Sequence, residues 1–279
     1  MCSGMSVDPR LRSLQIDLPT QPATLLRLSA LLADDAADLQ AAGALIEADM
    51  ALAAAVMKAV NSSLYGLSGR VQSVRQAVTY LGLREVAAIT YEFGLRAVFP
   101  AAAELEPLWR RASLRGLLMG RLGEALGVDP WAAHSAGLFE ECGKAVLFRH
   151  SPVRYLPLFV GAQDDAELIY LEHREYGVSH DALGAALCES WGLAMPAVQA
   201  VRHHVRVQAT RQLPAGLPRP AICVLSALAQ ALMNGAPDLE AAAEALAPQA
   251  QLDPTLVLRG LRRVADQLRE AQARATPGR

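Results

Sequence analysis

Aromatic residues are scarce in this chain. Phe, Trp and Tyr make up 5% of its 279 residues, although hydrophobic residues as a whole make up 52%. Alanine and leucine carry the apolar mass instead, and both residues favour helix. The β-branched and aromatic runs that strands need are few. The composition therefore predicts an all-α protein, long enough for one large helical domain or two lobes.

The chain also lacks an excess charge of one sign, a long apolar run and paired cysteines. Its formal net charge of −2 gives no basic face, so we expect no nucleic-acid partner. The most apolar stretches, 51–60 and 220–233, are shorter than the roughly 20 residues of a membrane helix. Residues 1–18 lack the apolar core of a signal peptide. Isolated cysteines suit a reducing compartment. Together with the short apolar stretches, they predict a cytoplasmic protein that does not contact a membrane. These cysteines are Cys2, Cys142, Cys188 and Cys223.

Several enzyme motifs are missing as well. The sequence holds no P-loop, no dinucleotide-binding glycine fingerprint and no nucleophile elbow. We therefore expect no cofactor. We also find no receiver, cyclase or helix-turn-helix segment, so the chain is expected to stand alone and to act through partners.

Capping residues and glycines predict where the helices begin and end. Asp49 and Asp165 are expected to cap helices, and Ser73 with Gln76 matches a capping box, in which each side chain accepts from the other's backbone amide. One helix is expected from 107 to Gly127. Another is expected to open at Asp129-Pro130 and to continue to the segment 143–147. Further helices are expected at Ser179 to Gly192, from Pro196, and at Ala221–Met233, Leu239–Leu246 and Asp253–Ala273.

These elements predict a multi-helix bundle in four parts. Residues 1–17 form a loosely ordered leader, and 18–104 an N-terminal helical lobe. Residues 105–210 form a second helical lobe, and 211–279 supply C-terminal helices that pack on it. The alternative for these last helices is dimerisation.

Four ordered blocks of residues resemble the HDOD family, the bacterial HD-related output domain, over roughly 15–210. The first block is Leu18-Pro19 followed by Leu25 and the Leu28–Leu32 face. The second is 61–66, then 73–77 and Leu81-Gly82. The third is Trp109 with Ser113, then 136–138 and 143–147, and the fourth ends at His203-His204. The fourth block also contains Glu172, Gly177, His180, Gly184, Trp191 and Pro196.

The resemblance implies an N-terminal helical lobe packed on a lobe shaped like an HD phosphohydrolase. It also implies a regulatory role without demonstrated catalysis. The related HD hydrolases need a His, a His-Asp pair and a further Asp around divalent metals. Here Glu140-Glu141 stands where the resemblance puts the His-Asp pair, and Ala112 stands near the upstream His position. We therefore expect a degenerate metal position, with no catalytic residue and no metal.

The two glutamates have two interpretations. They could ligate Mg²⁺ or Mn²⁺, since carboxylates bind hard cations. The favoured interpretation is that they cap a helix or form ion pairs, with Lys144 four residues after Glu140.

The remaining candidates are structural or binding residues. His203 and His204 point about 100° apart on a helix, so at most one can face a given site. Glu172 and His180 are expected to meet across the Gly177 turn and to hold two helices in register. Asn61 and Tyr65 belong to a turn that either stops a helix or forms a binding loop. Trp109 is expected in the core, and Trp191 is a further structural or binding candidate.

The sequence therefore predicts a signal-transduction module that binds a protein partner or a small ligand without hydrolysing phosphoesters. The alternative is a metal-dependent phosphohydrolase acting on a nucleotide or cyclic dinucleotide through a carboxylate-rich site.

Overall fold

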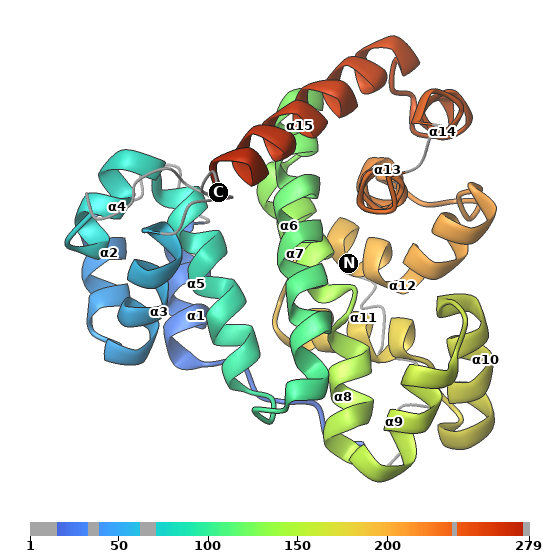
Figure 1. Cartoon of the computed structure of the whole chain (residues 1–279), viewed down its shortest axis with the longest axis horizontal. Helices are drawn as coiled ribbons and strands as arrows, with labels where there is room; N and C mark the ends of the chain where they lie inside the picture. Colours follow the sequence, from blue (N-terminus) through green and yellow to red (C-terminus); the bar gives the residue numbers. More distant parts are fainter. Residues whose placement is uncertain (1–15, 33–38, 62–70, 236–238, 276–279) are drawn as a thin grey trace, which may run out of the picture. The chain divides into compact units, whose positions relative to one another are not determined.

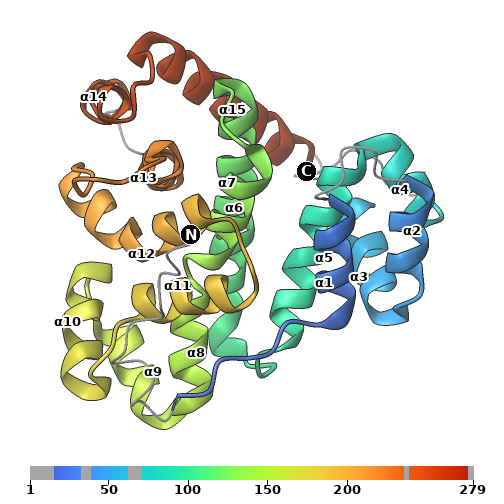
Figure 2. The same cartoon turned by 180° about the vertical axis from the view of Figure 1, so that it is seen from behind.

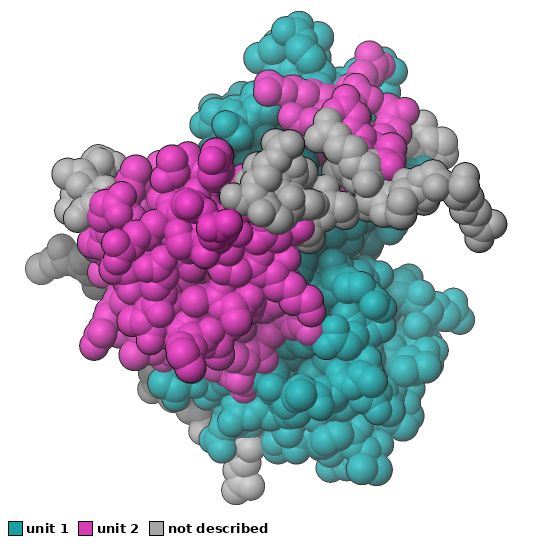
Figure 3. All heavy atoms as spheres, turned by 60° about the vertical axis from the view of Figure 1, so that its left-hand side comes forward, with its two compact units in different colours: residues 1–20, 99–261 teal, residues 21–98, 262–279 magenta. Residues whose placement is uncertain are grey.

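The computed structural model describes residues 16–32, 39–61, 71–235 and 239–275. Every regular element in these ranges is helical, which confirms the predicted fold class (Figure 1). The contacts divide the chain into two compact units, coloured separately in Figure 3. Unit 1 is Met1–Thr20 with Phe99–Leu261, and unit 2 is Gln21–Val98 with Arg262–Arg279. The expected four-part domain division stays a prediction.

Residues 21–98 of unit 2 hold five helices in the part of the chain that the structure describes. The core of unit 2 is formed by small apolar faces such as Leu28, Ile46 and Val60. The helices α1 and α5 approach closely, because a Cβ on Gly94 would lie 2.6 Å from the Leu25 side chain. Figure 2 shows these two helices side by side. The five helices are α1 (Ala23–Leu32), α2 (Leu39–Glu47), α3 (Met50–Val60), α4 (Val74–Leu81) and α5 (Leu83–Ala97).

Unit 1 holds the longer helices. α6 packs against α7 and α13, while α12 lies between α11 and α13. Short 3₁₀ helices stand at Ala103–Leu105 and Ala247–Ala250. The α-helices are α6 (Glu106–Leu126), α7 (Pro130–Phe139), α8 (Cys142–His150), α9 (Pro152–Gly161), α10 (Asp165–Tyr176), α11 (His180–Ser190), α12 (Met195–Thr210), α13 (Ala221–Met233), α14 (Leu239–Leu246) and α15 (Pro254–Ala275), the last of which crosses into unit 2.

Several predicted helix ends are present. Asp49 accepts from the Leu52 amide at 3.1 Å and caps α3. Asp129 accepts from two amides at the start of α7. Gly127 and Gly177 end α6 and α10 in the left-handed conformation, with φ of 68° and 70°, which an L side chain rarely adopts.

Other local predictions are wrong. The helix expected from Asp129 through 147 is two helices, α7 and α8, with the break at Glu140-Glu141. Asp164, rather than Asp165, caps α10 by accepting from the Glu167 amide at 2.8 Å. The capping box is also incomplete. Ser73 accepts from Gln76, but the Gln76 side chain accepts from the Gln72 amide instead of the Ser73 amide.

Candidate functional site

A buried ion-pair cluster lies where α6, α7 and α8 meet. Arg115 on α6 is fully buried, and its Nη1 lies 2.6 Å from Glu141 Oε1 and 3.2 Å from Glu140 Oε2. Its Nη2 donates to the amide oxygen of Gln230 on α13. Burying a guanidinium requires such partners, because an unpaired buried charge is very costly. Arg115 therefore joins α6 to the α7–α8 break and to α13.

Lys144 continues the cluster toward α10. Its Nζ lies 2.7 Å from Glu141 Oε2 and 2.8 Å from Asp165 Oδ1, and its side chain is only 3% exposed. The sequence predicted an ion pair between Lys144 and Glu140. In the structure, Lys144 instead forms ion pairs with Glu141 and Asp165. The predicted i,i+4 pair requires one continuous helix from Glu140 to Lys144. The chain instead breaks between α7 and α8, so Glu140 and Lys144 do not lie on the same helix.

Opposite charges set the protonation of this cluster. Burial by itself raises the pKa of Glu141, but the charges of Lys144 and Arg115 outweigh it and hold that pKa well below its usual value. Burial likewise lowers the pKa of Lys144, and the charges of Glu141 and Asp165 together raise it. Glu141 and Lys144 are therefore both ionised at neutral pH.

Glu172 and His180 make the contact that the sequence predicts. Glu172 Oε2 accepts from the His180 backbone amide at 2.7 Å and lies 2.7 Å from His180 Nδ1, while its Oε1 accepts from the Tyr155 hydroxyl at 2.7 Å. Ser179 occupies the N-cap position of α11, but its hydroxyl donates to Asp181 instead. The buried Glu172 side chain thus supplies the cap to α11 and connects α9, α10 and α11.

His204 faces the same interior from α12. It is fully buried, and its Nδ1 donates to the Val201 carbonyl at 2.6 Å. Its ring centroid lies 5.5 Å from that of His180. Burial lowers the pKa of His204. His203, the adjacent residue, is half-buried and belongs to no such contact, as the helical spacing predicts.

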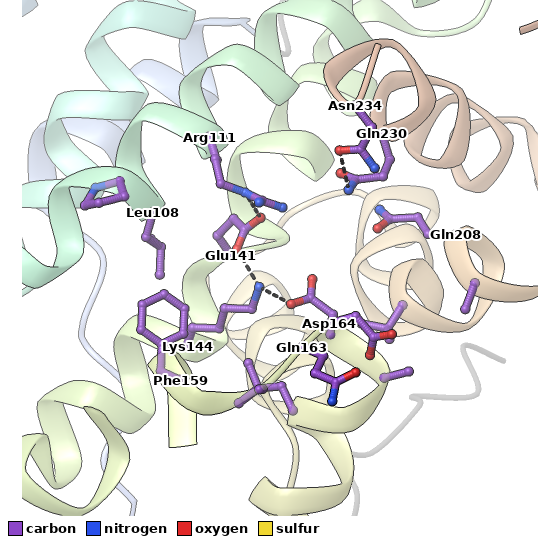
Figure 4. Close-up of a pocket in the computed structure, with 17 residues that line it drawn as sticks. Leu108, Arg111, Glu141, Lys144, Phe159, Gln163, Asp164, Gln208, Gln230 and Asn234 are labelled. Carbon is purple, nitrogen blue, oxygen red and sulfur yellow. Dashed lines mark hydrogen bonds and ion pairs between the residues drawn. The ribbon is translucent and has the colours of Figure 1, made fainter. Parts of the chain in front are cut away.

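A cavity of about 580 Å³ opens beside the ion-pair cluster (Figure 4). Arg111, Glu141 and Lys144 lie in its wall, and Arg111 Nε stands 3.6 Å from Glu141. Amide side chains from α12 and α13 line one side, and the apolar Leu108 and Phe159 line the opposite side. The amides are Gln208, Gln230 and Asn234. Such a lining suits a polar molecule with an apolar portion.

The other candidates among the described residues do not line this cavity. Trp109 and Trp191 are each 4% exposed, and Trp191 Nε1 donates to the Pro19 carbonyl at 2.9 Å. The side chain of Asn61 bonds to the Met57 and Val71 carbonyls, so it fixes the end of α3. Tyr65 lies outside the described residues. Ala112 is buried on α6, one turn before Arg115.

Arg115 and Tyr155 were not predicted as site residues, and Asp165 was predicted only as a helix cap. No local motif could have found them, because their partners lie on other helices, such as Glu141, 26 residues after Arg115. The one available signal was an arginine among apolar residues in the middle of α6, since Gly116, Leu117 and Leu118 follow it directly.

The chain belongs to the HDOD domain family, whose model matches residues 18–207. An uncharacterized protein of Treponema pallidum is 29% identical over 192 residues, which are 67% of this chain and 37% of that protein. The chain thus spans well under two thirds of this relative. In the described residues, no helix combines the length and apolar character needed to cross a membrane.

Two solved structures share the fold. A Shewanella amazonensis protein described as a candidate phosphohydrolase has a TM-score of 0.72 at 18% identity, covering 98% of this chain and all of that one. A Marinobacter aquaeolei protein described as a candidate signal transduction protein has a TM-score of 0.71 at 24% identity, covering 98% of this chain and 63% of that one. These likenesses show the helical fold.

Proposed function

We propose that this protein is a cytoplasmic regulatory module that binds a protein partner or a small ligand and does not hydrolyse phosphoesters. The family membership and the described role of the Marinobacter aquaeolei protein support a signalling role. One observation carries the proposal. Where the resemblance puts the His-Asp pair of the hydrolases, Glu140 and Glu141 lie in ion pairs with Arg115 and Lys144.

These residues do not fit the metal centre of a hydrolase. Glu141 uses both carboxylate oxygens on cations, and Glu140 Oε2 accepts from Gln208 as well as from Arg115. A divalent ion bound there would stand beside two buried positive charges, and like charges a few ångströms apart repel strongly inside a protein. No hydrolytic step follows from this arrangement.

An assay of the purified full chain tests the absence of hydrolysis. With Mg²⁺ or Mn²⁺ added, we expect cyclic di-GMP and a generic phosphodiester to be cleaved no faster than in protein-free buffer. Turnover of either substrate above the protein-free rate would contradict the proposal.

Ligand binding is tested by thermal shift with nucleotides and cyclic dinucleotides, since a ligand that binds only the folded state raises the melting temperature. Arg111→Ala removes a cavity-lining side chain, whereas Arg110→Ala removes its exposed neighbour outside the lining. A cavity ligand is expected to lose affinity in the first variant only. With no shift from any compound, a pull-down with the same pair of variants tests a protein partner at the cavity mouth.

A further inference from the structure

Two fully buried imidazoles each have a nitrogen without a hydrogen-bond partner. Among the described residues, His180 Nε2 and His204 Nε2 are in this state. Leaving a buried polar atom unpaired costs about 1–3 kcal/mol, so two such atoms on neighbouring rings call for a common partner.

The opposite nitrogens fix which way the rings can bind. His180 Nδ1 faces the Glu172 carboxylate and His204 Nδ1 faces the Val201 carbonyl, both of which accept hydrogen bonds. Each Nδ1 therefore carries its proton, and in the neutral ring each Nε2 holds a free lone pair. Metal-binding histidines are held by carboxylates and backbone carbonyls in this same way.

Asp165 supplies a third ligand. One carboxylate oxygen of Asp165 and one nitrogen from each of His180 and His204 lie within 4.8 Å of one another. We propose that these three residues bind one divalent transition-metal ion, of the class of Zn²⁺, Fe²⁺ or Co²⁺. Two imidazoles and one carboxylate suit such ions, and three protein ligands leave at least one coordination position open.

The distances require only a modest closure. Ligand atoms about 2.1 Å from a shared metal are at most about 4.2 Å apart. Asp165 Oδ1 already accepts from Lys144, so the metal takes the other oxygen. Asp165 also lines the cavity and is one-quarter exposed, which gives the ion a route to the buried rings.

The formal charges of the cluster favour a dication. Four carboxylates face two buried cations, and Arg111 adds a third cation that is half exposed. Lys144 bonds to Asp165, so one buried cation lies beside the proposed site, whereas Arg115 and Arg111 bond to Glu140 and Glu141. The carboxylates are Glu140, Glu141, Asp165 and Glu172, and the buried cations are Arg115 and Lys144.

Cobalt titration of the chelator-treated full chain tests this site. We expect one Co²⁺ per chain, with the visible absorption of protein-bound Co²⁺, displaced by one equivalent of Zn²⁺. His180→Gln and His204→Gln are expected to weaken binding at least 100-fold. His203→Gln is the matched control, because that residue is adjacent in sequence and outside the cluster.

Two further variants keep the test independent of folding. Asp165→Asn changes a partly exposed ligand with little change of volume and is expected to weaken binding by a similar factor. Glu172→Gln leaves all three ligands in place and is expected to weaken binding about 10–100-fold through the orientation of His180. Cooperative melting in chelator shows which variants are folded.

Wild-type protein that binds Co²⁺ no more tightly than folded Asp165→Asn would overturn the inference, and so would an equal loss in His203→Gln. The two nitrogens would then hold water. This result is separate from the proposed function. Metal binding without phosphodiester turnover agrees with both proposals, whereas turnover overturns only the absence of hydrolysis.

Discussion

At the scale of single residues, buried charges in this protein stabilise the fold only as a set. Arg115, Glu141 and Lys144 are each 3% exposed or less. Their mutual attraction offsets the cost of removing each from water, and this balance holds only while every partner is present. Removing one partner leaves the others uncompensated, so single substitutions here are expected to cost more than the same changes at the surface.

Glu141→Gln is expected to lower the free energy of unfolding by about 3 kcal/mol at pH 7, because it leaves Arg115 and Lys144 without one shared carboxylate. Urea unfolding followed by circular dichroism measures the change. Glu175→Gln is the control, since its ion pair with Arg154 is solvent-exposed and is expected to contribute less than about 1 kcal/mol. Equal losses in the two variants would contradict the argument.

The stability difference between wild type and Glu141→Gln is expected to depend on pH. Lys144 and Arg115 lower the pKa of Glu141 in the folded state below its ordinary value of 4.5. The stabilisation by Glu141 is therefore complete above about pH 4.5 and is lost as the pH falls through the folded pKa. The gap in unfolding free energy between wild type and Glu141→Gln should shrink from pH 6 to pH 3. A gap that widens on acidification would be inconsistent with this ionised cluster.

Residue types could be predicted from the sequence better than their partners. The contact between Glu172 and His180 was predictable because one glycine turn separates the two helices. The partners of Glu141 were not, since Arg115 lies 26 residues away on another helix. An arginine on a helix is usually solvated, so its burial depends on tertiary packing that no local pattern carries.

At the scale of helices, the close packing of α8 against α11 depends on a glycine, Gly143, at the point of contact. A Cβ on Gly143 would lie 1.8 Å from the His180 carbonyl oxygen, which is backbone and cannot turn aside. The close approach of these two helices positions His180 beside Lys144 and Glu172.

Gly143→Ala is therefore expected to destabilise the protein by about 3 kcal/mol or more, because α8 and α11 must separate. Gly161→Ala is the matched control, since its added Cβ meets no atom within 4 Å and helix propensity improves. Thermal melting of both variants measures the difference. A Gly143→Ala protein as stable as Gly161→Ala would show that the helices are not in contact there.

The two neighbouring aspartates at the start of α10 have different roles. Asp164 accepts from the Glu167 amide, whereas Asp165 bonds to Lys144. Asp164→Ala is expected to cost about 1 kcal/mol, the usual value of a lost N-cap. Asp164→Ser retains a capping oxygen, so it should recover most of the stability that Asp164→Ala loses. A melt series of these two variants checks the assignment.

Helix ends marked by glycine or proline were the elements easiest to predict. The predicted bounds of α13 and α14 agree with the structure. The break between α7 and α8 was not predictable, because Glu140 and Glu141 are not helix breakers by themselves. Their burial against Arg115 and Lys144 becomes evident only from the packed fold.

At the scale of the whole molecule, unit 1 contains both Pro19 and Trp191, so two distant parts of the chain share one core. Trp191→Phe removes the donor to the Pro19 carbonyl and is expected to cost about 1–2 kcal/mol. Hydrogen exchange should also rise at the amides of Leu18 and Thr20. Trp109→Phe is the control, because its side chain is equally buried and it lies elsewhere in unit 1. Equal protection of residues 16–20 in both variants would contradict the assigned role.

The bond between Trp191 and Pro19 spans 172 residues, and this separation has a consequence for synthesis on the ribosome. The partner of Pro19 does not exist until residue 191 has been translated. At about 5–20 residues per second, this takes on the order of ten to thirty seconds after Pro19 itself is made. During that interval the segment around Pro19 is available to chaperones and proteases, although the synthesis of residues 21–98 is complete well before the interval ends.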